Sequence, residues 1–283
     1  MFKDKNFKKY LWIYLGITFG LSWGISLLYV LCYKQLSPIF GKLNMSSPLV
    51  VIALNSPSIA GVFVYYVYGG KKSLLQFFKR LIPNLRECRW FIYLFIVSIA
   101  FFAAMHYGSI LLHIPLPKVK LSTNDRLVLL LKNIYEETGL LGGALGWYGF
   151  LLPYMQKRYH SSIKGGLMTG FIFGLFVLPG YALSSFETAT TYPFYVLQLM
   201  LFSVFIAFVM NQTRGNVLFF VFCFWLVASG SKLQFYNFIA GVQILEIGFF
   251  LITVIGMYLY YRIVKNKDLN TYSLCLFPDF IGN

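Results

Sequence analysis

The sequence predicts an all-α protein, a polytopic bundle of about eight transmembrane helices. Three observations support this. The 283 residues are 58% hydrophobic and only 12% charged, with a mean hydropathy of +0.69, whereas soluble domains are about 45–50% apolar and about 25% charged. Apolar runs near the length of a bilayer-crossing helix follow one another along nearly the whole chain. Lys and Arg gather in the short loops between them. We therefore expect one membrane domain over residues 1–267 and a short tail over 268–283.

Eight apolar runs account for the expected spans. The fourth is interrupted by several glycines, and the seventh is short, so these two are the weakest members of the series. Between the third and fourth runs, residues 127–135 are expected to form a short amphipathic helix along the interface, capped by the polar residues 122–125. The expected spans are 10–33, 48–68, 90–114, 138–156, 163–184, 191–211, 215–231 and 236–262.

The basic residues predict the orientation. When the N-terminus is placed in the cytoplasm, most of the 24 Lys and Arg residues fall in cytoplasmic loops, as the positive-inside rule requires. This arrangement puts both termini in the cytoplasm of a multi-pass protein of the cell membrane. It also explains the net charge of +15, so nucleic acid is not expected as a partner. The four cysteines show no CxxC spacing and are expected to act as small apolar residues.

Few ionisable residues fall near the spans, and these are the candidates for chemistry. Glu246 lies within the last span, as a proton site, an ion-pair partner or a protonated, hydrogen-bonded residue. His106 and His113 lie seven residues apart in the third span, on one expected helical face. Glu136 and Glu137 precede the fourth span and could complete a metal site with the histidines, although ordinary interfacial polar roles are favoured. The chain has no HExxH, GxSxG or P-loop motif, and no metal or cofactor is expected.

Three stretches carry a resemblance to a known family. Residues 143–179 read GALGWYGFLLPYMQKRYHSSIKGGLMTGFIFGLFVLP, and residues 211–218 read NQTRGNVL. They resemble the core of the CPBP family of intramembrane metalloproteases, also called Abi, which includes CAAX proteases and bacteriocin-processing enzymes. The family's motifs read roughly EExGWRGFLLP, FGxxHLP, and NxTGGSVL before a helix with HxxxN. The resemblance implies a CAAX-protease-like fold with core motifs over 138–230. The matching positions include Gly146, Trp147, Gly149, Pro153, Phe173, Gly174, Pro179, Thr213 and Gly215.

The catalytic positions of the family are replaced in this chain. The paired glutamates, the arginine, the two histidines and the asparagine of the motifs fall, in that order, on Gly143 and Ala144, on Tyr148, on Val177 and Phe224, and on Ala228. Apolar and aromatic side chains at these positions cannot supply the carboxylate base or the metal ligands. The resemblance therefore implies a pseudo-protease without catalytic residues.

The expected function follows from this loss. A degenerate CPBP-like protein in a bacterial cell membrane is expected to be a scaffold or regulator that binds another membrane protein or a peptide. Bacteriocin self-immunity and control of a sensor or a cell-envelope enzyme are examples. Two alternatives remain: an active CAAX-type endopeptidase whose site is rearranged around Glu136, Glu137, His106 and His113, and a small transporter that uses Glu246.

Overall fold

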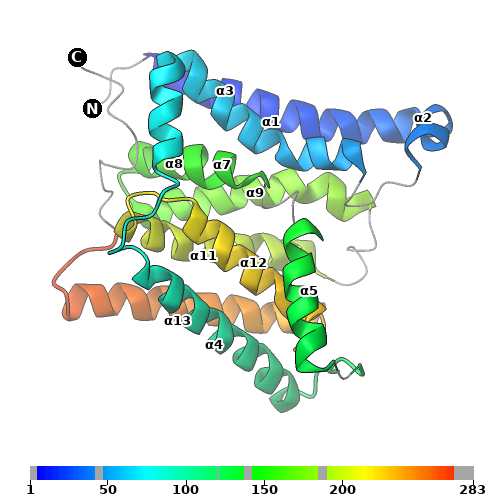
Figure 1. Ribbon diagram of the computed structural model, residues 1–283, viewed down its shortest axis with the longest axis vertical. Helices are drawn as coiled ribbons and strands as arrows, with labels where there is room; N and C mark the ends of the chain where they lie inside the picture. The colour runs from blue at the N-terminus through cyan, green and yellow to red at the C-terminus, as the bar shows by residue number, and fades with distance from the viewer. Residues whose placement is uncertain (1–4, 42–46, 120, 137–141, 184–189, 271–283) are drawn as a thin grey trace.

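The computed structural model describes residues 5–41, 47–119, 121–136, 142–183 and 190–270, and within these ranges the protein is helical without strands (Figure 1). The all-α prediction is thus confirmed. The helices are α1 (Lys5–Leu31), α2 (Tyr33–Phe40), α3 (Pro48–Lys79), α4 (Arg89–Leu111), α5 (Thr123–Glu136), α7 (Ala144–Gly146), the π-helical turn η1 (Trp147–Leu151), α8 (Leu152–Tyr159), α9 (Ser162–Leu183), α11 (Tyr192–Gln212), α12 (Leu218–Lys232) and α13 (Ala240–Ile263).

Six of the described helices are long and apolar enough to cross a bilayer: α1, α3, α4, α9, α11 and α13. They coincide with six of the eight expected spans, and the protein is a multi-pass membrane protein. The seventh expected span is the 15-residue helix α12. The fourth is divided into α7, η1 and α8, because a π-helical turn over Trp147–Leu151 interrupts the α-helical ladder and Pro153 follows at the start of α8.

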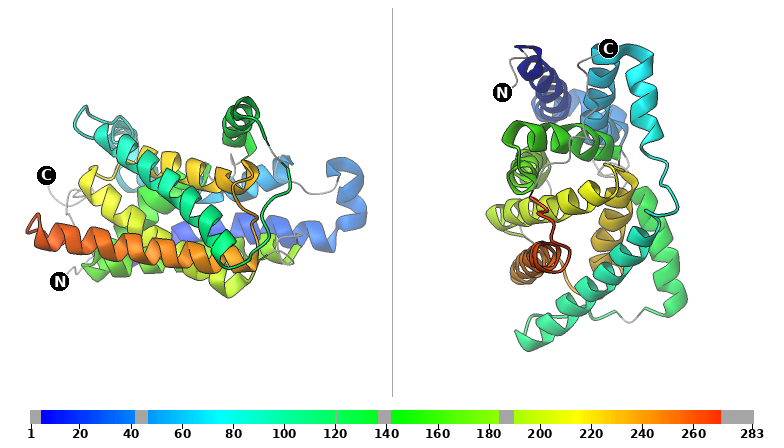
Figure 2. Two further views of the ribbon diagram at one scale, coloured as in Figure 1. Left: turned by 90° about the horizontal axis from the view of Figure 1, so that it is seen from below. Right: turned by 90° about the vertical axis from the view of Figure 1, so that its left-hand side faces the viewer.

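Two segments run across the direction of the bundle. Helix α3 bends at Gly69 and Gly70, where Gly70 has a φ of +61°, and its last part turns across one end of the bundle (Figure 1). Helix α5 lies at a steep angle to the long helices near the opposite end (Figures 1 and 2). Its start is a reciprocal cap: the Asp125 amide donates to Ser122 Oγ, and the Ser122 amide donates to Asp125 Oδ2, both at 3.2 Å. The expected short capped helix is therefore present.

The cap also acts on the acid that forms it. Hydrogen bonds from the Ser122 hydroxyl and amide lower the pKa of the Asp125 carboxyl below its usual value. The carboxylate form is thus favoured at the N-terminus of α5, where the helix dipole also favours negative charge.

Glycines bring helix backbones into contact in the core. A Cβ on Gly166 would lie 2.6 Å from Val204 Cα, and one on Gly170 would lie 2.4 Å from Met200 Cα, so α9 and α11 touch along their backbones. A Cβ on Gly146 would lie 2.0 Å from the Pro57 carbonyl oxygen of α3. Close approach of this kind is how helices associate in lipid, where the solvent is as apolar as the side chains.

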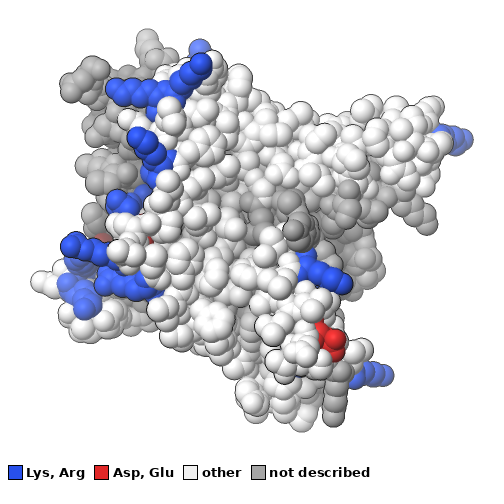
Figure 3. Space-filling view, viewed as in Figure 1, with Lys and Arg blue, Asp and Glu red and all other residues white. Residues whose placement is uncertain are grey.

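Positive charge gathers at one end of the bundle. Figure 3 shows Lys and Arg side chains along the end at which α1 begins and α13 ends, with fewer at the opposite end. Two loops meet there through the Arg214–Glu87 ion pair, in which Arg214 Nε lies 2.5 Å from Glu87 Oε1. The Glu87 carboxylate raises the pKa of the Arg214 guanidinium. We call this surface the basic end.

The glycine contacts predict a sharp difference between two substitutions. Gly146→Ala forces a methyl group into the backbone of α3, and overpacking of this kind costs about 1–3 kcal/mol or more. Gly248→Ala on α13 meets nothing within 4 Å and should leave stability unchanged or raise it by up to about 1 kcal/mol, because alanine favours helix. Thermal unfolding of the two purified variants in detergent measures the difference. Equal midpoints would contradict the packing described here.

Candidate functional site

The positions that resemble the first catalytic motif lie in the core. Ala144 and Tyr148 are 1% and 0% exposed, and Gly143 is also buried. The Tyr148 hydroxyl lies 2.8 Å from Ser203 Oγ, and its ring stacks on Phe220 with the centroids 3.9 Å apart. The Tyr148 side chain is therefore both packed against another ring and hydrogen-bonded in the core.

The positions that resemble the other two motifs lie on α9 and α12. Val177 is half-buried and packs against the core. Phe224 lies 5.4 Å from Phe220, ring centroid to centroid, so an aromatic chain joins Tyr148 to Phe224. Phe224 and Ala228 both line a cavity described below. Aromatic packing therefore joins the segment that resembles the first motif to the segment that resembles the third motif.

Several residues that match the motifs of the family have close packing contacts in the bundle. The Trp147 and Phe173 rings stack at 4.9 Å, and both are 1% exposed. A Cβ on Gly149 would lie 2.7 Å from the Phe77 ring, and one on Gly174 would lie 2.9 Å from Val196. Pro153 is buried in α8, and Pro179 lies within α9.

The turn that resembles NxTGGSVL ends helix α11. The Thr213 hydroxyl donates to the Val209 carbonyl at 3.0 Å, and the Gly215 amide donates to the Met210 carbonyl at 2.9 Å. Gly215 has a φ of +71°, the left-handed conformation that favours glycine after a helix.

The histidines do not share a helical face. Helix α4 ends at Leu111, so His113 lies beyond the helix with a φ of +53°. His106 Nδ1 lies 2.9 Å from the Phe235 carbonyl oxygen, which is a structural contact. The side chain of Glu136 and the whole of Glu137 lie outside the described residues. Among the residues that are described, no three His, Cys, Asp or Glu side chains gather in one place.

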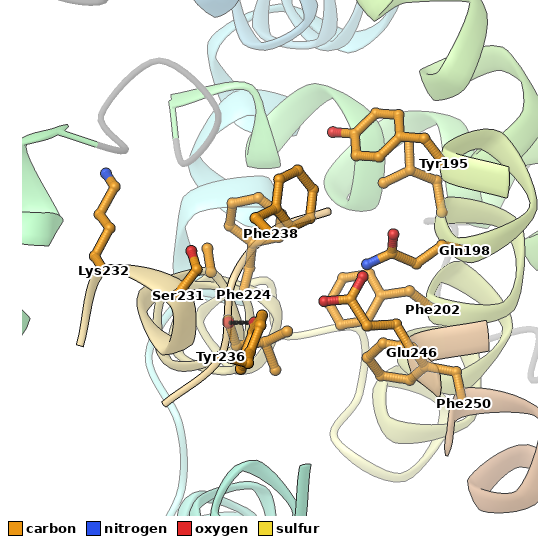
Figure 4. Close-up of a pocket in the computed structure, with 13 residues that line it drawn as sticks. Tyr195, Gln198, Phe202, Phe224, Ser231, Lys232, Tyr236, Phe238, Glu246 and Phe250 are labelled. Atoms are coloured by element: carbon orange, nitrogen blue, oxygen red, sulfur yellow. Dashed lines mark hydrogen bonds between the residues drawn. The ribbon is translucent and has the colours of Figure 1, made fainter. Parts of the chain in front are cut away.

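Glu246 lies in a cavity between helices α11, α12 and α13 (Figure 4). It is 1% exposed, six residues after the start of α13, about 9 Å along the helix from the end opposite the basic end. The cavity has a volume of about 230 Å³. Six of the 13 residues that line it are aromatic, namely Tyr195, Phe202, Phe224, Tyr236, Phe238 and Phe250, and its polar members include Gln198, Ser231 and Lys232. We call it the Glu246 cavity.

The Glu246 carboxyl has polar partners but no cation. The Tyr236 and Gln198 side chains interact with it, and Figure 4 shows the Gln198 amide nitrogen directed at it. Its Oε2 atom has no partner among the described residues. Lys232 points away from the carboxyl, because its Nζ donates to Asn133 Oδ1 at 2.6 Å (Figure 4). No Lys, Arg or His of the described chain lies within 4 Å of this carboxyl.

Two further amides accompany the carboxyl, and the sequence analysis did not single them out. Gln198 leaves its Oε1 unpartnered. Gln243, one turn before Glu246, is 0% exposed, and its Oε1 accepts the Thr191 amide at 2.8 Å while its Nε2 is unpartnered. A polar amide within an apolar span is the signal that could have revealed both residues.

Fold and cavity together define a class: a multi-pass helical membrane protein with a buried, uncompensated carboxyl in an aromatic cavity. Comparison with protein-family models gives no match, and comparison with curated proteins gives none either.

The geometry predicts opposite effects for two exchanges within one face of α13. Glu246→Gln keeps the volume, removes the possibility of charge and should raise stability, on the order of 1 kcal/mol. Gln243→Glu adds a second buried carboxyl one turn away and should lower stability by at least about 1 kcal/mol. Thermal midpoints in neutral detergent measure both. Destabilisation by Glu246→Gln as large as that by Gln243→Glu would show that the carboxyl is needed for folding rather than for a ligand.

Proposed function

We propose that this chain is a catalytically degenerate CPBP-like membrane protein that acts as a scaffold or regulator, binding a peptide or a transmembrane segment of another protein through a basic side chain. The observation that carries the proposal is the Glu246 carboxyl, buried in an aromatic cavity without a cation among the described residues. Intramembrane ionisable groups are rare and are kept chiefly where they serve a function.

The chemistry of the cavity suits a cationic guest. In a water-poor site, a guest ammonium or guanidinium group would neutralise the carboxylate and satisfy its unpartnered oxygen. Aromatic faces attract cations, and Tyr195, Phe202, Phe224 and Phe238 line the cavity. Nothing else in the described part of the cavity wall supplies this charge, since Lys232 is held by Asn133.

The size of the cavity favours a side chain over a whole ligand. An apolar cavity of about 150 Å³ accepts benzene, and this one has about 230 Å³. One Lys or Arg side chain fits such a volume. A peptide or a transmembrane segment can insert that side chain while the rest of it stays in lipid or against the bundle.

The proposed CPBP-like origin would account for the position of the Glu246 cavity. The replaced third-motif positions, Phe224 and Ala228, line the same cavity as Glu246. A site that once held a peptide for cleavage would then hold one without cleaving it. Roles that fit such binding are bacteriocin self-immunity and control of a membrane sensor or a cell-envelope enzyme.

Transport is less well supported by the same carboxyl. A transporter needs polar groups along a path between the two ends of the bundle. Beyond Ser203, helix α11 presents a continuous buried apolar stretch over residues 204–210 before Asn211. A protease with a rearranged site is also less well supported, because His106 is engaged by the Phe235 carbonyl.

The binding proposal predicts charge-selective association within a bilayer. The probe is a single-span Leu/Ala peptide that carries one Lys at the depth of Glu246, compared with the same peptide carrying norleucine. The Lys peptide should bind the protein at least tenfold more tightly, a difference of about 1.4 kcal/mol. Energy transfer between the labelled peptide and the labelled full chain in phosphatidylcholine vesicles measures both affinities.

Two variants distinguish the effect of the cavity carboxyl on peptide binding from the effect of the protein's net charge. Glu246→Gln should abolish the preference for the Lys peptide. Asp268→Asn removes a carboxylate from the exposed segment after α13 and should leave the preference intact, because the Asn oxygen can still accept the Asn270 amide. Equal binding of the two peptides to the wild type would overturn the proposal, and cleavage of the Lys peptide would favour the enzyme alternative.

The proposed orientation places the basic end in the cytoplasm, with both termini on that side. It is supported by the gathering of Lys and Arg at this end (Figure 3). Reporters inserted at Lys71 and Lys164 should read as cytoplasmic, and one inserted at Glu187 should read as external. A periplasmic signal at Lys71 would reverse the orientation.

A further inference from the structure

A second concavity lies at the basic end, between the start of α4 and the end of α13. It has a volume of about 630 Å³ and is lined by Arg89, Trp90, Tyr93, Met257, Tyr260 and Lys265, among others. The two helices run antiparallel and cross at an angle, and their ends separate toward this side (Figure 2, left). We call it the α4–α13 groove.

The mouth of the groove carries two uncompensated cations. Arg89 and Lys265 are both exposed, and neither has a carboxylate within 4 Å among the described residues. Lys265 Nζ lies 5.9 Å from the centre of the Tyr260 ring. The nearest described ion pair at this end, Arg214–Glu87, uses neither of them. The groove therefore presents unpaired positive charge to an anion.

The floor of the groove is aromatic and apolar. Trp90 and Met257 are each 7% exposed, and the Trp90 and Tyr93 rings lie 5.2 Å apart. The Tyr93 hydroxyl reaches the Met257 sulfur at 4.0 Å, which closes the base between the two helices. Gly256 contributes no side chain, and a Cβ there would meet nothing within 4 Å. The groove is thus open above a continuous apolar floor.

Beyond the groove, the same two helices expose aliphatic side chains. Ile96 of α4 is 59% exposed and Ile252 of α13 is 72% exposed, each about one turn further from the basic end. From that end inward, the surface therefore runs from cations through a Trp/Tyr collar to bare aliphatic residues. This is the order of headgroup, interface and hydrocarbon in a bilayer.

We propose that the α4–α13 groove binds one anionic phospholipid. Its phosphate lies between Arg89 and Lys265, and its acyl chains follow the exposed aliphatic faces of α4 and α13. Basic pockets between transmembrane helices are suited to anionic headgroups, and each cation near the surface is worth about fivefold in affinity. The apolar floor and the aliphatic continuation require chains as well as charge, which a free anion lacks.

Native mass spectrometry of the purified full chain tests the proposal. The protein is titrated with phosphatidylglycerol and with phosphatidylcholine of identical acyl chains. The wild type should bind the anionic lipid about 25-fold more tightly, and Arg89→Gln plus Lys265→Gln should remove that preference. Arg86→Gln plus Lys267→Gln removes the same charge from exposed residues outside the groove. This variant should keep the preference for the anionic lipid.

A second pair of variants tests the groove without changing charge. Gly256→Leu fills open space above the floor and should weaken binding of the anionic lipid at least fivefold. Gly248→Leu, equally open but outside the groove, should not. Equal affinity of the wild type for the two lipids would overturn the proposal, as would a preserved preference in the Arg89/Lys265 variant. Displacement of the lipid by millimolar inorganic phosphate would also overturn it, because it would define a site for a free anion.

Discussion

Gly146 lets the short helical segment after residue 142 reach the backbone of α3 at Pro57, and much of the bundle depends on contacts of this kind. Lipid gives helices no hydrophobic reason to associate, so their stability comes from close van der Waals approach. Gly166 and Gly170 do the same between α9 and α11. These contacts set the positions of Trp147 and Phe173, whose stacked rings tie the interrupted segment to α9.

The aromatic core follows from that framework. Tyr148, Phe220 and Phe224 form a continuous chain in the region where the resemblance would place a base, an arginine and a histidine. Neither Phe220 nor Phe224 brings a polar side chain into this chain of rings. The same rings hold the segment at Tyr148 in contact with helix α12.

Charge is arranged in two separate ways in this molecule. At the basic end it is abundant and solvated, and Arg89 and Lys265 lie there above an apolar groove. Near the other end it is a single buried carboxyl, Glu246, among aromatic rings and the Gln198 amide. The first arrangement costs little because water and headgroups screen it. The second is unfavourable in its charged form, because a buried carboxylate loses its hydration without gaining a cation.

The sequence by itself determined the membrane class, the helical fold and the position of six long spans, because apolar length and basic loops are local properties of the chain. It also located the cap at Ser122 and Asp125 and singled out Glu246 as an ionisable residue within a span. Tertiary structure decided the rest. The division of the fourth span at Trp147–Leu151 depends on packing against α3 and α9. Gln198 of α11, Glu246 of α13 and Tyr236 of the segment between α12 and α13 meet only in the folded bundle, and no spacing along the chain encodes that meeting.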